Sequence, residues 1–166
     1  MKSVSICCWS GVYVGGYLGP YFFERTCTGE SYLNMLRNDI VPELRRKGLL
    51  ETAVFQQDGA PPHWSREVRD YLTMTFGDRW IGRGGPTAWP ARSPDLTPPD
   101  FFLWGHLKQQ VYAGRPLNLE HLRALIVARF DEIPRRMFRD SCNQNLIGRM
   151  EECVRVGGGH IKHRFG

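Results

Sequence analysis

Apolar and polar positions alternate over residues 3–14, and a period of two is the pattern of a β-strand with one buried face. A Gly15-Gly16 turn signal follows, and residues 17–24 form a second run rich in aromatic and apolar side chains. Pro20 confines part of this run to a sheet edge or a bulge, because proline cannot donate to a strand ladder. The pattern therefore predicts a β-hairpin at the start of the chain.

Further along, apolar residues recur every three or four positions, which predicts helices. The predicted helices cover residues 30–47, 64–76, 97–112, 119–133 and 135–156. Pro42 should kink or restart the first helix, and Pro134 should separate the last two. Short strands are predicted over residues 52–57 and near residues 79–81 or 87–89. This order of elements predicts a mixed α/β fold with a mixed sheet.

Each of the last two helices has one apolar face that we expect to be buried. In the first of them the face is formed by Leu119, Leu122, Ile126 and Ile133. In the second it is formed by Phe138, Cys142, Leu146, Met150 and Val154.

The composition supports one globular domain of ordinary size. The chain has 166 residues, of which 42% are hydrophobic and 12% aromatic, so it can form a core. No run approaches the roughly 18 consecutive apolar residues of a membrane-spanning helix. Polar residues interrupt the N-terminal apolar stretch, so we expect a strand there rather than a secretory leader. The five cysteines are an odd set without metal-ligand spacing, which favours a reducing compartment over a disulfide scaffold.

The net charge of +5 lies entirely in the C-terminal third of the chain. Residues 106–166 hold 11 Lys/Arg against 6 Asp/Glu, whereas residues 1–105 hold 11 of each. A basic segment can dock onto phosphates through the release of counterions. It can equally be the solvated face of basic helices. Charge alone leaves both interpretations open.

Two aspartates occupy positions where chemistry is common. Asp58 directly follows a predicted strand, a favoured place for functional groups in open α/β sheets. Asp100 lies in the first turn of a predicted helix, three residues after its candidate N-cap, Thr97. Each also has a purely structural interpretation, because Asp58-Gly59 is an ordinary turn dipeptide and Thr97 with Asp100 matches a capping box.

Two longer strings around these aspartates carry more information. One is Phe-Gln-Gln-Asp-Gly-Ala-Pro-Pro-His at residues 55–63. The other is Trp-Pro-Ala-Arg-Ser-Pro-Asp-Leu-Thr-Pro-Pro-Asp-Phe-Phe-Leu-Trp at residues 89–104. Together they resemble the mariner-type transposases of the DDE superfamily, where an acid–Asn/Gly–Ala–Pro–x–His string ends a strand and Ser-Pro-Asp-Leu-x-Pro-x-Asp/Glu opens a helix. Near-matches at residues 9–11, 19–23 and 157–160 extend the resemblance over nearly the whole chain.

The resemblance implies an α/β, ribonuclease H-like mixed sheet, N-terminally truncated, with C-terminal helices. It implies a DDE endonuclease domain over residues 1–115 and a basic helical extension over residues 116–166, packed on the same domain. The second and third acids of the family's catalytic, metal-binding triad would fall on Asp58 and Asp100, which are separated by 41 residues. Asp95 is the rival for the third position, but by the family's pattern it is the Ser-Pro-Asp loop residue.

The family's first acid, on its first strand, has no counterpart in this sequence. Residues 1–23 contain no Asp or Glu, so we expect the chain to begin at the family's second strand and to lack its helix-turn-helix region. DNA strand cleavage uses two Mg²⁺ ions about 4 Å apart, which carboxylates hold in place. Asp58 and Asp100 alone should bind Mg²⁺ or Mn²⁺ weakly and should not fix a pair of ions, so we expect no strand cleavage.

The missing strand has a structural consequence as well, because it is central in the family's sheet. Without it, backbone groups on both neighbouring strands lose their partners. We therefore expect either that residues 3–14 pair directly with residues 52–57, or that the fold is marginal.

The candidates for nucleic-acid contact are His63, Arg79, Arg83, Arg92 and Lys108. His63 matches the family's histidine and could orient a metal-bound water or a phosphate, or it could simply pack on Trp64. Arg79 and Arg83 lie in a segment that mixes cations, an aromatic residue and glycines. Such a segment suits phosphate contact and stacking, and it is also the composition of a plain surface loop. It is not a P-loop, because no Gly-Lys-Ser/Thr follows.

The sequence thus predicts a remnant of a transposase catalytic domain that binds nucleic acid and is catalytically defective. A non-catalytic DNA- or RNA-binding module that uses the basic C-terminal third is a second interpretation. A protein-interaction or dimerisation module is the alternative. We expect DNA as the partner, a nuclear location, no membrane and no small-molecule substrate, with a homodimer left open.

Overall fold

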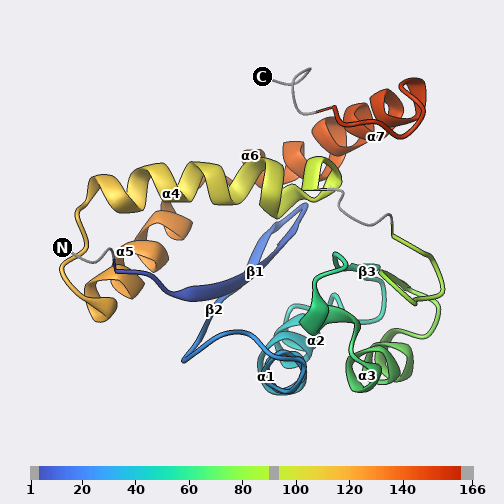
Figure 1. Cartoon of the computed structure of the whole chain (residues 1–166), viewed down its shortest axis with the longest axis horizontal. Helices are drawn as coiled ribbons and strands as arrows, with labels where there is room; N and C mark the ends of the chain where they lie inside the picture. The colour runs from blue at the N-terminus through green and yellow to red at the C-terminus, as the bar shows by residue number, and fades with distance from the viewer. Residues whose placement is uncertain (1–3, 90–93, 162–166) are drawn as a thin grey trace. The chain divides into compact units, whose positions relative to one another are not determined.

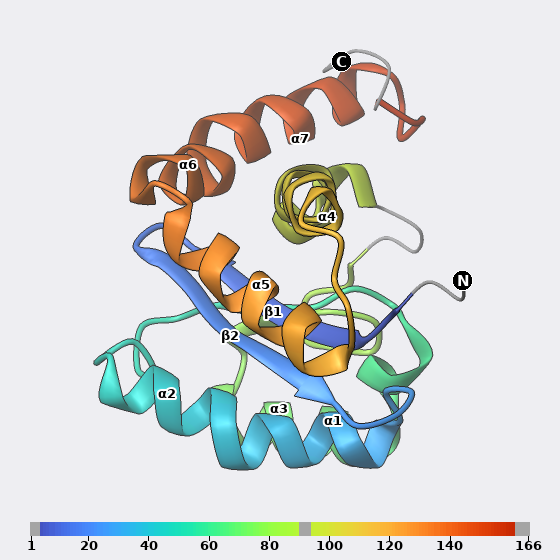
Figure 2. The same ribbon diagram turned by 90° about the vertical axis from the view of Figure 1, so that its left-hand side faces the viewer.

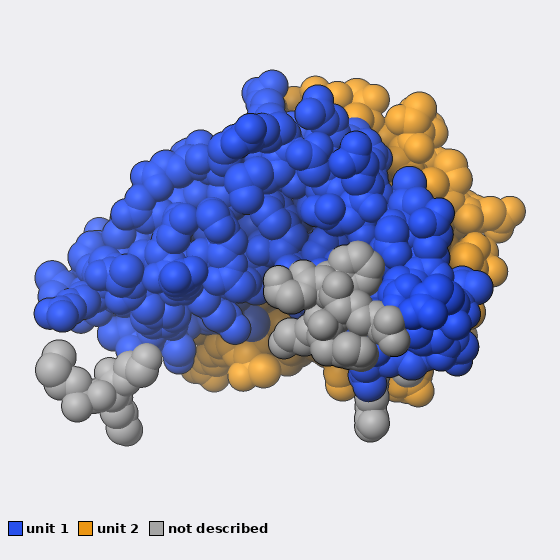
Figure 3. Space-filling view, turned by 90° about the horizontal axis from the view of Figure 1, so that it is seen from above, with its two compact units in different colours: residues 1–22, 94–166 blue, residues 23–93 orange. Residues whose placement is uncertain are grey.

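The computed structural model describes residues 4–89 and 94–161, and it divides into two compact units that Figure 3 shows in different colours. Unit 1 contains residues 1–22 and 94–166, and unit 2 contains residues 23–93. Each unit is described by itself below. The predicted domain boundary at residue 115 stays a prediction.

The predicted N-terminal hairpin is confirmed. Strands β1 (Cys7–Tyr13) and β2 (Gly16–Phe23) pair with each other, and the buried hydroxyl of Ser10 donates to the Leu18 carbonyl at 2.8 Å. β2 includes Pro20, which fits a strand with one paired side. β1 begins at Cys7, four residues later than the start of the alternating pattern.

The remaining elements of unit 1 are helical. They are η3 (Pro94–Leu96), η4 (Pro99–Leu103), α4 (Trp104–Ala113), α5 (Leu119–Glu132), α6 (Arg135–Asp140), η5 (Ser141–Asn145) and α7 (Leu146–Arg155). Helix α5 starts where the Asn118 side chain accepts a 2.8 Å hydrogen bond from the His121 N–H, an N-cap. Pro134 separates α5 from α6 as predicted.

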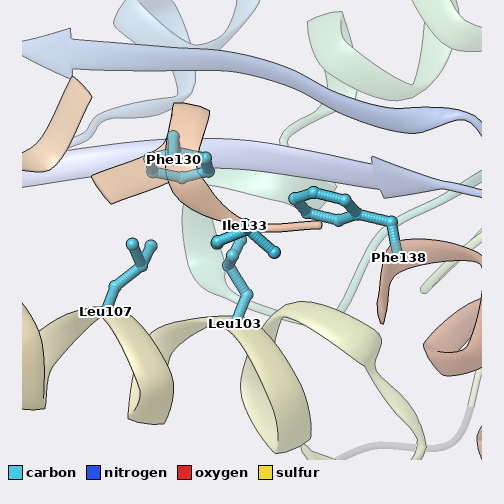
Figure 4. Packing of buried hydrophobic residues seen from close by; sticks show 5 residues of the cluster. All are labelled: Leu103, Leu107, Phe130, Ile133 and Phe138. Atoms are coloured by element: carbon cyan, nitrogen blue, oxygen red, sulfur yellow. The ribbon is translucent and has the colours of Figure 1, made fainter. Parts of the chain in front are cut away.

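The core of unit 1 joins the hairpin to the helices. Leu103 and Leu107 face Phe130, Ile133 and Phe138 from across the cluster that Figure 4 shows. On the strand side, the Tyr17 ring lies 4.8 Å from that of Phe130 and 5.6 Å from that of Phe138. Helix α5 therefore packs along the hairpin, as Figure 2 also shows.

The prediction of buried faces on the last two helices is only partly correct. Leu119 is 51% exposed, Met150 36% and Val154 81%, and α7 has no buried residue among those described. Helix α7 contacts the rest of unit 1 through Arg149, whose guanidinium donates to the Asp95 carbonyl at 3.3 Å and lies over the Phe101 ring, 4.2 Å from its centroid. Its apolar stripe is left facing outward.

In unit 2, one long helix runs through Pro42 without breaking. It consists of α1 (Gly29–Met35), the π-helical stretch η1 (Leu36–Ile40) and α2 (Val41–Arg46). A proline ring clashes with the carbonyl four residues earlier, and the wider π-helical turn before Pro42 relieves that clash. The helix therefore continues through Pro42 by a local widening, without the predicted restart.

A second helix and a very small sheet complete unit 2. Helix α3 (Arg66–Phe76) follows the single turn η2 (Pro61–Trp64) and lies beside α1 (Figure 1). Strand β3 (Phe55–Gln56) pairs in parallel with β4 (Trp80–Ile81). Of the two positions predicted for the last strand, residues 79–81 form it, and residues 87–89 contribute one bridge, from Thr87 to Ile81.

The two sheets are separate in the described part of the chain: β1 pairs with β2, and β3 with β4. Direct pairing of residues 3–14 with residues 52–57, one of the two sequence-based alternatives, is not among the strand pairs of the described residues. No helix among the described residues has the length and apolar character that crossing a membrane requires.

Candidate functional site

Asp58 lies where the parallel strand pair of unit 2 ends. The Phe55 N–H donates to the Arg79 carbonyl and the Gln57 N–H to the Ile81 carbonyl, each at 2.9 Å. Asp58 is the next residue, at the carboxyl end of β3. This is the edge of a parallel sheet at which α/β proteins place their functional groups.

Both hydrogen bonds to the Asp58 carboxylate are made to the same oxygen. Oδ1 accepts from the Ala60 N–H at 3.0 Å and lies 2.5 Å from His63 Nδ1. Oδ2 accepts no hydrogen bond from the residues that the structure describes. The Asp58 side chain is 43% exposed, so the carboxylate is partly open to solvent.

His63 sets the charge of this carboxylate. Its hydrogen bond lowers the pKa of Asp58, partial burial opposes that effect, and the Ala60 N–H adds to it. Asp58 is therefore ionised at neutral pH. Because Asp58 accepts, the ring nitrogen Nδ1 of His63 is the donor.

A second layer of buried polar groups holds His63. The Tyr32 hydroxyl donates to Gln57 Oε1 at 3.1 Å, and Gln57 Nε2 donates to the His63 carbonyl at 2.5 Å. The Tyr32 and His63 rings lie 4.3 Å apart. Tyr32 is fully buried and Gln57, the residue after β3, is 5% exposed, so these hydrogen bonds connect helix α1 and turn η2 to the end of the strand, behind the carboxylate.

This arrangement goes beyond the sequence interpretation in two ways. His63 contacts Asp58 itself through Nδ1, and its predicted role toward a metal-bound water or a phosphate stays a prediction. The sequence did not identify Gln57 and Tyr32 as site residues. The polar pair Gln56-Gln57 at the end of an apolar strand did indicate that one of the two glutamines is buried and hydrogen-bonded.

Asp100 and its rival Asp95 both lie in unit 1. The Asp100 N–H donates to the Thr97 carbonyl at 2.9 Å, and the exposed Asp100 side chain opens η4. Asp95 is used structurally: its Oδ2 accepts from the Ile161 N–H at 3.2 Å and lies 3.8 Å from His160 Nδ1. Asp58 and Asp100 belong to different units, and their common site stays a prediction.

The basic candidates occupy different environments. Arg79 Nη1 donates to the Leu50 and Ala53 carbonyls at 3.0 and 2.7 Å, a structural use of the guanidinium. The Arg83 guanidinium stacks on the Trp64 ring, 3.8 Å from its centroid. Lys108 lines a cavity of about 350 Å³ in unit 1, with residues of β1, α4 and α5. Arg92 lies outside the described residues. Nucleic-acid contact by these residues stays a prediction.

The described residues contain no group of three or more His, Cys, Asp or Glu side chains placed to hold a metal ion. Asp58 nevertheless has the chemistry that Mg²⁺ or Mn²⁺ prefers: an ionised carboxylate with one oxygen unused by the described residues. The site geometry therefore provides one good ligand.

Two transposases are similar to the chain in sequence. The Tc3 transposable-element transposase of Caenorhabditis elegans is 29% identical over 144 residues, which cover 86% of this chain and 41% of that protein. The Tcb2 transposase of Caenorhabditis briggsae is 31% identical over 87 residues, 52% of this chain and 29% of that protein. The chain thus spans less than half the length of these curated relatives. No protein-family model matches it.

Solved structures of Mos1 mariner transposase share the fold. Its catalytic domain superposes with a TM-score of 0.77 at 24% identity, covering 93% of this chain and 74% of that one. The same domain with Raltegravir and Mn gives 0.75 at 23% identity, over 93% and 76% of the two chains. A Mos1 paired-end complex with the left transposon end gives 0.72 at 24% identity, over 93% and 44%.

These findings confirm the ribonuclease H-like fold that the resemblance implied. They also agree with the positions of the two motif strings, one ending β3 and the other opening η4. The chain is similar in sequence to the Tc3 and Tcb2 transposases, and it shares the fold of the Mos1 transposase catalytic domain.

Proposed function

We propose that this chain is a DNA-binding derivative of a transposase catalytic domain, located in the nucleus, that keeps one metal-binding carboxylate but does not cut DNA by itself. The observation that carries the proposal is the geometry of Asp58. His63 and Ala60 hold it through Oδ1, it is ionised, and its Oδ2 has no partner among the described residues.

A divalent ion at this position would polarise a phosphodiester and activate an attacking oxygen. Asp58 would supply a ligand oxygen, and Asp100 stays a metal ligand predicted by the family resemblance. Mos1 catalytic-domain structures contain Mn or Mg, which supports a divalent ion for this chain too. His63 keeps the Asp58 carboxylate in place and ionised, and Tyr32 and Gln57 keep His63 in place.

Loss of cleavage is proposed from the acids that the chain contains. Residues 1–23 carry no Asp or Glu. With Asp58 and Asp100 alone, no third carboxylate bridges two ions and fixes their separation. We therefore expect weak binding of one ion and no nicking.

DNA is proposed as the partner on two grounds. The Mos1 structures of the same fold include a complex with a transposon end. The excess positive charge of this chain is concentrated in residues 106–166, and such charge favours a polyanion.

The purified 166-residue chain tests both parts. Fluorescence anisotropy should show DNA binding whose affinity falls steeply as salt is raised. A supercoiled plasmid with Mg²⁺ or Mn²⁺ should show no more nicking than with the Asp58→Asn variant. Absence of salt-dependent binding would contradict the DNA-binding part, and metal-dependent nicking that Asp58→Asn abolishes would contradict the loss of cleavage.

A second candidate function, a dimerisation module, is favoured by helix α7. Its apolar residues Ile147 (55% exposed), Met150 and Val154 form an outward stripe one turn apart. Sedimentation velocity over a range of protein concentrations tests it. Concentration-dependent dimers that Val154→Glu disrupts would support this function, and a monomer at all concentrations would contradict it.

A further inference from the structure

The Arg83 side chain of unit 2 is stacked on an aromatic ring. Its guanidinium lies over the Trp64 ring at 3.8 Å from the centroid, a close cation–π contact. Its side-chain stem passes beside Gly59, where an added Cβ would lie 3.8 Å from Arg83 Cδ. Arg83 is exposed and is thus held next to the residue that follows Asp58.

A second guanidinium lies against the neighbouring residue. Arg69, on α3, packs over Gly84, and a Cβ there would lie 2.9 Å from Arg69 Nη1. Gly84 has φ +74°, so a side chain at this position would be strained as well as crowded. Gly84 therefore allows the Arg69 side chain to approach the loop that carries Arg83.

Neither arginine has an acidic partner in the described part of the chain. No ion pair or side-chain hydrogen bond involves Arg83 or Arg69, and Arg69 Nε is buried without an acceptor. Arg66, on the same helix as Arg69, does pair, 3.8 Å from Asp70. Buried donors normally have acceptors, and an anion bound at the Arg69 guanidinium would give it a partner.

We propose that Arg83 and Arg69 form a clamp for a DNA backbone phosphate beside Asp58, with Trp64 as the platform that holds Arg83 in position. A planar guanidinium recognises phosphate through two parallel hydrogen bonds, and stacking fixes its orientation in advance. The clamp rests on the proposed function, because it assigns part of the DNA contact to this loop. It adds a site outside the basic C-terminal third.

The test compares arginine-to-alanine variants of the full 166-residue chain, each of which removes one positive charge. Arg37 is the matched control, because it also stacks on an aromatic ring in unit 2, at 5.2 Å from the centroid of Tyr71, with no ion pair among the described residues. Binding of a short labelled DNA duplex is measured by anisotropy at several salt concentrations. Thermal unfolding of each variant shows that it is folded.

Arg83→Ala should raise Kd about tenfold and lower the slope of log K against log salt by about 0.9, the value of one phosphate contact. The double variant with Arg69→Ala should lower the slope by about twice that amount. Trp64→Leu should raise Kd about two- to threefold with little change of slope, because no charge is lost. Arg37→Ala should leave both quantities close to wild type.

The outcomes separate the clamp from the proposed function. If the wild type binds DNA and Arg83→Ala behaves like Arg37→Ala, the clamp is wrong and DNA binding stands. If the wild type shows no salt-dependent binding, both are overturned. A loss of affinity in Arg83→Ala that Arg83→Lys fully restores, with the original Kd, would contradict the planar stacked geometry and leave only a point charge.

Discussion

At the scale of single residues, the orientation of Asp58 depends on side chains that do not touch it. Tyr32 and Gln57 are buried and bonded to each other, and Gln57 is bonded in turn to the His63 backbone. A buried polar network is stabilising only when all its members are paired, because an orphaned buried acceptor has lost its water as well as its donor. The position of His63 is therefore fixed from behind.

Tyr32→Phe tests this network. The change leaves Gln57 Oε1 buried without its donor, so we expect the free energy of unfolding to fall by about 1–2 kcal/mol. Tyr71→Phe makes the same chemical change in α3, where the hydroxyl makes no hydrogen bond to the described residues, and should cost less than about 0.5 kcal/mol. Urea unfolding measures the loss of unfolding free energy in both variants. Equal losses would show that the hydrogen bond from the Tyr32 hydroxyl to Gln57 adds no stability.

Cys8 provides a second test at this scale. Burial, with a smaller contribution from Cys7, raises the pKa of Cys8 from 9.0 to about 12. Only the thiolate reacts with an alkylating reagent. At pH 8 such a reagent should therefore modify Cys8 about a thousandfold more slowly in the native protein than in the unfolded chain. The rate should still be rising with pH above 10. Mass-spectrometric mapping that finds Cys8 labelled equally fast in both states would contradict this account.

At the scale of the elements, the local sequence determines the bounds of the helices more closely than those of the strands. The helix through residues 29–46 follows its apolar period and its Thr28 cap, and Pro42 changes only its local width. Strand β3 has two residues paired with two in β4, so its stability depends on neighbours that a local pattern does not contain. The predicted strand of residues 52–57 accordingly shrinks to Phe55–Gln56.

Hydrogen exchange tests this difference. The amides of Phe55 and Gln57, although hydrogen-bonded to the carbonyls of Arg79 and Ile81, should exchange much faster than those of Val68 and Leu72, which are fully buried in α3. Peptide-resolved exchange measured by mass spectrometry gives the comparison within one sample. Equal protection of β3 and α3 would contradict a marginal sheet.

At the scale of the whole molecule, the two motif strings predicted the fold that the structure and the similar proteins confirm. The strings at residues 55–63 and 89–104 identified the family resemblance and the ribonuclease H-like fold, because they place acids at a strand end and a helix start. Periodicity located all five predicted helices. It could not tell that α7 leaves its apolar stripe exposed, since a helix face shows what can be buried and not whether a partner covers it.

The contacts that organise the candidate site could not be predicted from the sequence, for a related reason. Tyr32 reads as one more apolar position of a helix, and only the fold brings its hydroxyl to Gln57, 25 residues away. Arg69 and Trp64 likewise have ordinary helical positions. Their relation to Arg83 depends on the loop around Gly84, whose path is not encoded in any local period.

The central proposal is that the ionised Asp58 carboxylate, held by His63, binds a divalent ion, and paramagnetic broadening by Mn²⁺ tests it most directly. In two-dimensional NMR spectra of the folded chain, low Mn²⁺ concentrations should broaden the amide signals around residues 58–60. Asp58→Asn should remove this broadening, because the ion loses the ligand that His63 holds in place. Broadening around residues 58–60 that persists unchanged in Asp58→Asn, or its absence in the wild type, would contradict the proposal.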